Sequence, residues 1–213
     1  MIKAVLWDFG GVITSSPFEA FNRFEESNGL PIDVIRKINS TDPECNAWAL
    51  LESSKITVDE FDIKFAEEAR CLGHDIRGAD VLSLLSGEIR PEMVNALKII
   101  KSTLRIGCIT NNVNTGEGPS MSRDPGKAAR VSEVMDLFDI VIESSKVGFR
   151  KPDPAIYRMA CDEMDIEPAE AIFLDDLGIN LKPARQLGMI TIKVLSAEQA
   201  LAALEEHLGF PLR

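Results

Sequence analysis

The sequence contains few of the side chains that form zinc sites or disulfide frameworks. Its 213 residues include four cysteines and two histidines, His74 and His207. The cysteines lie far apart and include no Cys-x-x-Cys pair, so neither a zinc site nor a disulfide framework is indicated. We expect reduced, mostly buried thiols in a cytoplasmic protein at all four positions, Cys45, Cys71, Cys108 and Cys161.

Long apolar runs and an excess of basic residues are also absent. The apolar run at the amino terminus is broken by Asp8, which makes it too short for a signal peptide or a membrane-spanning helix. With 23 basic and 34 acidic side chains, the chain has a net charge of -11 and no basic patch, so it should repel nucleic acid and anionic membranes. We predict a cytoplasmic protein that binds neither, and the sequence does not indicate its oligomeric state.

Several catalytic motifs are missing as well. The patterns Gly-x-x-x-x-Gly-Lys, His-Glu-x-x-His and Gly-x-Ser-x-Gly do not occur, which argues against nucleotide-loop, zinc-protease and serine-hydrolase chemistry. No repeat, low-complexity run or interdomain linker is apparent in the chain. The length fits one domain of ordinary size with an insertion.

What the chain does contain is an apolar strand that ends in a carboxylate. Residues 3–15 read KAVLWDFGGVITS, so the apolar run from Ala4 to Trp7 is followed by Asp8 and then by Gly10 and Gly11. Such a run is typical of a central parallel strand, and ligands bind outside the carboxyl ends of such strands. The two glycines would let the backbone turn sharply and bring its amides close to an anion. Alternatively, Asp8 merely caps the following turn.

Further polar groups follow later apolar runs. Ile106 to Ile109 precedes a hydroxyl and two amides, Ala171 to Leu174 precedes two carboxylates, and a lysine stands just before Pro152. The alternatives without a function in catalysis are that the paired acids cap the next helix and that the lysine lies on the surface. The residues concerned are Thr110, Asn111, Asn112, Lys151, Asp175 and Asp176.

The segment 16–86 has helical rather than strand periodicity. Phe18, Phe21 and Phe24 recur at helical spacing, and Thr57 followed by Glu60 forms a capping box for a second helix. Its aromatic stripe either lines a pocket or, the interpretation we prefer, packs a core between helices.

The remainder alternates helix and strand, with a glycine- and proline-rich loop at 113–127 that either shapes specificity or is a plain surface loop. This pattern predicts a doubly wound α/β parallel sheet, with residues 1–15 and 87–213 as the core domain and 16–86 as a helical insertion. The expected helices are 91–102, 128–137, 154–164 and 181–187, the last ended by Gly188, and the expected strands are 104–109, 138–142, 171–174 and 190–194.

Taken together, these four groups of residues resemble the signature motifs of the haloacid dehalogenase-like (HAD) hydrolases. The resemblance is strongest in residues 143–157, ESSKVGFRKPDPAIY, and 173–189, FLDDLGINLKPARQLGM, and within the family it is closest to the phosphatase domains of the soluble epoxide hydrolases. It implies a Rossmann-like core whose helical insertion is a cap over the active site. Epoxide opening belongs to a separate domain in those proteins and is not expected here.

The resemblance also implies a phosphatase that acts on small phosphorylated molecules. By the family pattern, Asp8 attacks phosphorus to form an aspartyl-phosphate. The side chains of Thr110 and Asn111 and the backbone N–H groups after Asp8, that of Gly10 included, hold the phosphoryl oxygens, and Lys151 neutralises their charge. Oxygen ligands without histidine or cysteine favour Mg²⁺, with Asn180 supporting the acidic loop from behind. The metal ligands would be Asp8, the Gly10 carbonyl, Asp176 and, directly or through water, Asp175.

One position departs from the family pattern. Two residues after the nucleophile, most phosphatases of the family have a second aspartate as general acid and base, and here that position is Gly10. Three functions stay open: a magnesium-dependent phosphatase that uses good leaving groups or a substitute acid, a metal-independent 2-haloacid dehalogenase, and a non-catalytic binding protein. The paired acids Asp175 and Asp176 favour the first.

Overall fold

The computed structural model describes residues 1–113 and 124–212, and its centre is a five-stranded sheet with strand order β3-β2-β1-β4-β5. Every neighbouring pair of strands is parallel. The strands are β1 (Ala4–Trp7), β2 (Arg105–Thr110), β3 (Ile140–Glu143), β4 (Ala171–Asp175) and β5 (Ile190–Lys193). The predicted α/β fold with a parallel sheet is confirmed.

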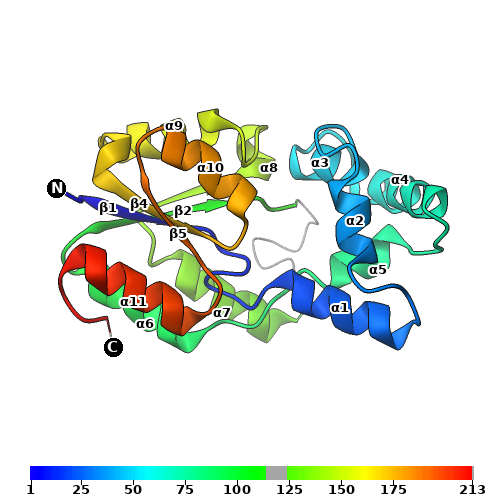
Figure 1. The fold of residues 1–213 in the computed structure, drawn as a ribbon, viewed down its shortest axis with the longest axis horizontal. Coiled ribbons are helices and arrows are strands. Elements are labelled where there is room, and N and C mark those ends of the chain that lie inside the picture. Colours follow the sequence, from blue (N-terminus) through cyan, green and yellow to red (C-terminus); the bar gives the residue numbers. More distant parts are fainter. Residues whose placement is uncertain (114–123, 213) are drawn as a thin grey trace.

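Two hydrophobic clusters bury the two faces of this sheet, which explains why β1 is apolar throughout. Side chains that alternate along β1 enter different clusters: Val5 and Trp7 pack in one, and Ala4 and Leu6 in the other. The helices α9 and α10 cover one face, and α6, α7 and α11 cover the other (Figure 1). These helices are α6 (Pro91–Lys101), α7 (Pro125–Met135), α9 (Pro154–Glu163), α10 (Gly178–Gln186) and α11 (Ala197–Leu208), and the one-turn helix α8 (Ser144–Val147) follows β3.

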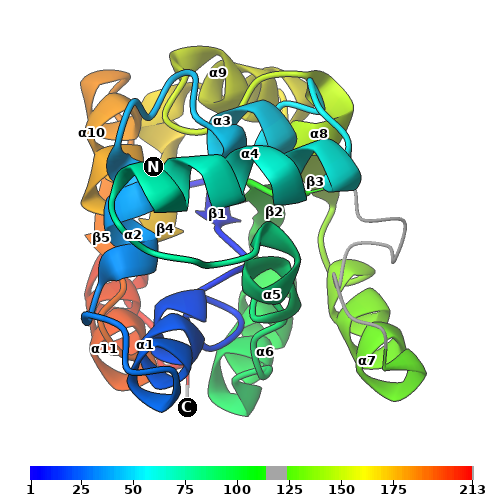
Figure 2. The same ribbon diagram turned by 90° about the vertical axis from the view of Figure 1, so that its right-hand side faces the viewer.

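Five helices lie between β1 and α6 and surround a third hydrophobic cluster. Phe21, Phe61 and Phe65 are buried in it, as expected for a core between helices, although Phe21 also lines a cavity. The capping box of Thr57 and Glu60 is present at the start of α4. Figure 2 shows this group of helices in front of the sheet. They are α1 (Pro17–Ser27), α2 (Val34–Ser40), α3 (Ala47–Glu52), α4 (Val58–Cys71) and α5 (Gly78–Ser83).

The chain enters and leaves this helical group through two adjacent segments. Thr14 and Ile89 form an antiparallel bridge, the Ser15 N–H donates to the Glu88 carbonyl at 2.7 Å, and the Arg90 N–H donates to the Ile13 carbonyl at 2.9 Å. The chain therefore passes between the helical group and the sheet domain through one pair of adjacent segments.

Several predicted bounds differ from the structure. The helix predicted from residue 128 begins at Pro125, because Asp124 accepts from the Gly126 N–H and caps it, so the predicted loop is wrong over residues 125–127. Residues 114–123 of that loop lie outside the described residues. The helix predicted from 181 begins at Gly178, and α11 was not predicted at all.

Two of the four thiols, those of Cys45 and Cys71, are exposed, so the prediction that the thiols are mostly buried is wrong. Among the described residues no helix is long and apolar enough to cross a membrane.

Candidate active site

The predicted site residues gather at the carboxyl edge of the three central strands. Asp8 follows β1 directly, Thr110 ends β2, and Asp175 ends β4. Because β1 lies between β2 and β4, the parallel register brings these three side chains to one edge. The structure thus brings together residues that are up to 167 positions apart in the chain, as the motif pattern predicts.

Lys151 lies at the centre of this edge. Its ammonium nitrogen is 2.8 Å from Asp8 Oδ1 and 2.8 Å from Asp175 Oδ2, and its side chain is 1% exposed. Burial alone would lower the pKa of Lys151, but the two carboxylates outweigh burial and raise the pKa. Lys151 is therefore a fully buried cation beside Asp8, and the alternative of a surface lysine is wrong.

Asp175 serves as the anchor of the site. Asn180 donates to both of its carboxylate oxygens, at 3.1 and 3.0 Å, and the Leu177 N–H donates to Oδ1 at 2.7 Å. Tyr157 donates in turn to the carbonyl of Asn180 at 2.7 Å. These hydrogen bonds orient the Asp175 carboxylate toward Lys151.

Asp176 lies against the glycine turn that follows β1. A Cβ at Gly11 would lie 2.2 Å from Asp176 Oδ2, and Gly11 has φ +74, so this position needs glycine for both conformation and space. Ser16 donates to the same Oδ2 at 3.3 Å. The turn after Asp8 and the acids after β4 are therefore packed directly against each other.

Asp8, Asp175 and Asp176 form a group that could hold a cation. Each offers an oxygen, and these three oxygens lie within 4.8 Å of one another. Burial and the neighbouring acids raise the pKa of Asp8 well above its usual range, although Lys151 opposes the rise. Burial and Asp175 raise the pKa of Asp176 to about 6. With one lysine among three carboxylates, ionisation leaves an excess of negative charge that a divalent cation with a preference for oxygen would offset.

The two side chains expected to bind phosphate have different surroundings. Thr110 is buried and lines the cavity described below. The side chain of Asn111 instead pairs with the backbone of Lys151, accepting from its N–H at 2.8 Å and donating to its carbonyl at 2.9 Å. The neighbouring Asn112 donates to Glu143 at 2.7 Å. In this structure the Asn111 amide therefore positions Lys151, a role that the motif did not predict.

Gly10 occupies the place of the missing acid. A Cβ at Gly10 would meet no atom of residues 1–113 and 124–212 within 4 Å, and the φ of Gly10 is not in the left-handed region. Of the two glycines expected to let the backbone turn, Gly11 is thus the one whose conformation favours glycine. The turn is also supported by Arg90, which donates to the Gly11 carbonyl at 2.9 Å.

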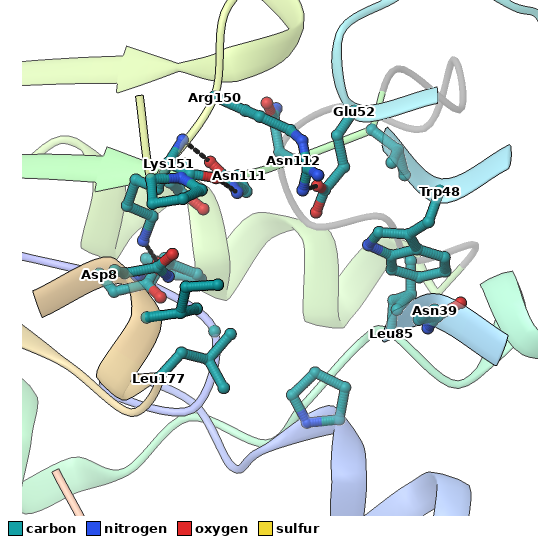
Figure 3. Close-up of a pocket in the computed structure, with 18 of the residues that line it drawn as sticks. Asp8, Asn39, Trp48, Glu52, Leu85, Asn111, Asn112, Arg150, Lys151 and Leu177 are labelled. Atoms are coloured by element: carbon teal, nitrogen blue, oxygen red, sulfur yellow. Dashed lines mark hydrogen bonds and ion pairs between the residues drawn. The ribbon is translucent and has the colours of Figure 1, made fainter. Parts of the chain in front are cut away.

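A cavity of about 940 Å³ lies above these residues. Its floor contains Asp8, Asp176 and Lys151. Its roof comes from the helical group, with Trp48 and Glu52 on α3 and Asn39 on α2 (Figure 3). Glu52 is buried and pairs with Arg150, which directly precedes Lys151 in the chain. A cavity of this size holds a ligand much larger than phosphate alone.

Sequence reasoning missed four polar residues that shape this site. Arg150 and Tyr157 lie inside the stretch that carries the family resemblance, so their position was available as a signal although their contacts were not. Ser16 and Arg90 lie outside any motif, at the two ends of the helical segment.

A model of the family described as haloacid dehalogenase-like hydrolase matches residues 2–188. Among sequence relatives, the chain is 34% identical to mouse acyl-CoA dehydrogenase family member 10 over 99% of the chain and 19% of that protein. It is 31% identical to mouse bifunctional epoxide hydrolase 2 over 98% of the chain and 39% of that protein. The chain thus spans less than half the length of these two relatives. A phosphatase of Mycobacterium tuberculosis is 27% identical over 88% of the chain and 85% of its own length.

Solved structures show the same fold. A HAD family enzyme of Bacteroides thetaiotaomicron, crystallised in complex with magnesium and inorganic phosphate, aligns with a TM-score of 0.63 over 96% of this chain and 99% of its own, at 20% identity.

Proposed function

The chain belongs to the haloacid dehalogenase-like hydrolase family, and from that premise we propose that it is a magnesium-dependent phosphatase of small phosphorylated metabolites. One observation carries the proposal: a fully buried lysine joins Asp8 to Asp175 at the edge of the sheet, with Asp176 beside them. This arrangement offers a nucleophile, a fixed positive charge and a set of oxygen ligands at one point. Relatives that are phosphatases support the same reaction class.

In this proposal Asp8 is the nucleophile. One oxygen of its carboxylate attacks phosphorus, the bond from phosphorus to the leaving oxygen breaks, and an aspartyl-phosphate forms on Asp8. Water then attacks the phosphorus and releases phosphate, which restores the carboxylate. Lys151, whose Nζ is 2.8 Å from Asp8 Oδ1, restrains the nucleophile and offsets the charge of the phosphoryl oxygens.

The remaining residues bind and orient. Thr110 contributes its hydroxyl to the phosphoryl group, and Asn111 acts by holding the backbone of Lys151. Asn180 and Tyr157 keep Asp175 in position. Phosphate binding by Asn111 itself, which the family pattern implies, would require its amide to leave Lys151.

The donor set fits Mg²⁺. Asp8 and Asp176 would hold the ion together with the Gly10 carbonyl, and Asp175 directly or through water, because a hard cation prefers oxygen. When bound, the ion supplies positive charge that lets an anionic ester approach a carboxylate. Burial and, after it, the neighbouring Asp175 raise the pKa of Asp176, and a bound cation would favour its charged form.

The helices α1–α5 are proposed to act as a cap, with residues 16–86 as the cap domain and 1–15 and 87–213 as the core domain. The support is that these helices have their own hydrophobic cluster, form the roof of the cavity and join the sheet domain through one pair of segments. The free state of all four cysteines supports the cytoplasm as the site of action.

A substrate panel tests the function. The wild-type protein should hydrolyse p-nitrophenyl phosphate and some phosphorylated metabolites with Mg²⁺, and should lose that activity with a chelator. Chloride release from 2-haloacids without metal would instead indicate a dehalogenase, in which Asp8 attacks carbon. Binding of phosphorylated compounds without turnover of either class would indicate a binding protein.

A further inference from the structure

Arg150 directly precedes Lys151 in the chain, and its side chain contacts the roof of the cavity. Its Nη1 lies 2.6 Å from Glu52 Oε2 on α3, and its Nη2 donates to the carbonyl of Pro43, just before that helix. Figure 3 shows Arg150 extending from the Lys151 side of the cavity to Glu52. One side chain of the sheet domain thus holds two points of the roof.

The partner carboxylate is buried, which makes this ion pair sensitive to loss of either member. The Glu52 side chain is 9% exposed, and burial raises its pKa, although Arg150 and a hydrogen bond with Trp48 oppose the rise. Removal of one member of a buried pair leaves an uncompensated charge, so the remaining partner must move toward water or change its protonation. Loss of Arg150 would therefore leave Glu52 either to move toward water or to take up a proton, and in both cases the contact that holds α3 to the sheet domain is lost.

The other side of the same chain segment is held by the floor. Asn111 pairs with both backbone polar groups of Lys151, and Lys151 Nζ bridges Asp8 and Asp175. Arg150 is consequently held by the roof, and the next residue, Lys151, is held by the catalytic edge. A shift of the roof that pulls on Arg150 acts on the backbone that carries Lys151.

From this geometry we propose that Arg150 is a positioning residue that couples the placement of α3 over the cavity to the alignment of Lys151 with Asp8. The proposal rests on the proposed phosphatase function. Lys151 is aligned for reaction when Glu52 and the Pro43 carbonyl hold Arg150. A substrate that leaves these two contacts intact is therefore turned over faster than one that displaces the roof. Nothing in the signature motifs requires Arg150 for chemistry, and it acts through its neighbour rather than on the reacting atoms.

Two conservative variants and their combination test the coupling. Arg150→Gln and Glu52→Gln should each lower kcat for p-nitrophenyl phosphate about 10- to 100-fold, the usual cost of losing a supporting partner, with KM changed less than about threefold. Because the two residues act as one unit, the double variant should be no more than about threefold slower than the slower single variant. Independent, multiplying effects on kcat would overturn the proposal.

A matched control separates coupling from simple loss of a contact. Ser54, just after α3, donates to the Ser145 carbonyl of α8 at 2.9 Å and does not line the cavity. Ser54→Ala removes a contact between the same roof helix and the sheet domain, and should leave kcat within about twofold of wild type. An equal loss of kcat in Ser54→Ala, or unchanged kcat in Glu52→Gln, would overturn the role of Arg150.

A readout without turnover keeps the two proposals apart. Hydrogen exchange should become faster in Glu52→Gln both in α3 and in the residues around Lys151, and in Ser54→Ala only in the roof. If the wild-type protein hydrolyses no phosphate ester, the phosphatase function fails while this comparison still decides the coupling. Faster exchange confined to α3 in Glu52→Gln would refute the coupling whatever the activity. Should Arg150→Gln fail to fold, Glu52→Gln, which retains a polar partner for Trp48, carries the same test.

Discussion

The floor and the roof of the cavity are built in different ways. Three side chains of the floor stand at the ends of buried parallel strands, where Asp8 follows β1, Thr110 ends β2 and Asp176 follows β4, so the register of three adjacent strands sets their positions. Lys151 instead lies in the segment after α8. The roof consists of side chains from α2 and α3, whose positions depend on how five short helices pack around their own cluster. From this contrast we infer that the floor would supply the reaction chemistry of the proposed phosphatase and that the roof would contact the rest of the substrate.

The largest effect is expected at the floor. Asp8→Asn should reduce turnover by roughly 10⁴-fold or more while the protein stays folded, because the amide is nearly isosteric but is not a nucleophile. Steady-state rates together with circular dichroism check this. Substantial activity in the variant would rule out the covalent mechanism.

The second prediction concerns the floor position that departs from the family. Wild type should hydrolyse aryl and acyl phosphates far faster than glycerol phosphate, because Gly10 has no proton for a poor leaving group. Gly10→Asp should speed alkyl phosphates by roughly 10²- to 10⁴-fold and flatten the dependence of rate on leaving-group pKa. The space around a Cβ at Gly10 allows the side chain to enter, whereas Gly11→Asp, the matched control, should disrupt the turn.

The same position governs the second half-reaction. Without an acid at residue 10 to activate water, wild type should accumulate phosphoenzyme and show a burst of product in rapid-mixing measurements. Equal rates on alkyl and aryl esters with no burst would mean that another group supplies the proton.

The third prediction moves to the roof. Trp48→Ala should raise KM for bulky aryl phosphates about tenfold or more, because its ring lines the cavity, and should leave KM for acetyl phosphate nearly unchanged. Trp48→Phe should restore most of the affinity. A uniform loss on all substrates would show that the roof supports the floor rather than selecting the substrate.

The fourth prediction concerns the metal. Mg²⁺ at about 100 times its Kd should stabilise the folded protein by about 2.7 kcal/mol, which raises Tm by roughly 5 to 10 °C, because the unfolded chain has no clustered acids. Asp176→Ala should remove this rise, and Asp75→Ala, a change at an exposed acid far from the cluster in sequence, should not. Thermal scans with and without Mg²⁺ decide the matter.

The smallest effect is a pH dependence of stability in the absence of metal. The pKa of Asp176 rises from 3.8 to about 6 on folding. Between these two values the folded state binds more protons than the unfolded state, so the contribution of Asp176 to stability falls as pH rises, by up to ~1.4 kcal/mol per pH unit. Asp176→Asn should remove this slope in urea titrations at pH 4.5 to 6. An unchanged slope would mean that Asp176 titrates normally.

The sequence was sufficient to predict the sheet and the residues at its carboxyl edge. A short apolar run bounded by glycines favours a central strand, whose following polar residue lies at the carboxyl edge, and the resemblance to the family joined Asp8, Thr110 and Asp175 into one predicted site. Tertiary structure decided the rest. The Asn111 amide turned to the Lys151 backbone, Gly11 rather than Gly10 proved to be the position that needs glycine, and Arg150 reached across to Glu52. These contacts join residues that lie far apart in the chain and belong to no repeating pattern. Which of them meet therefore depends on how the helices and strands pack.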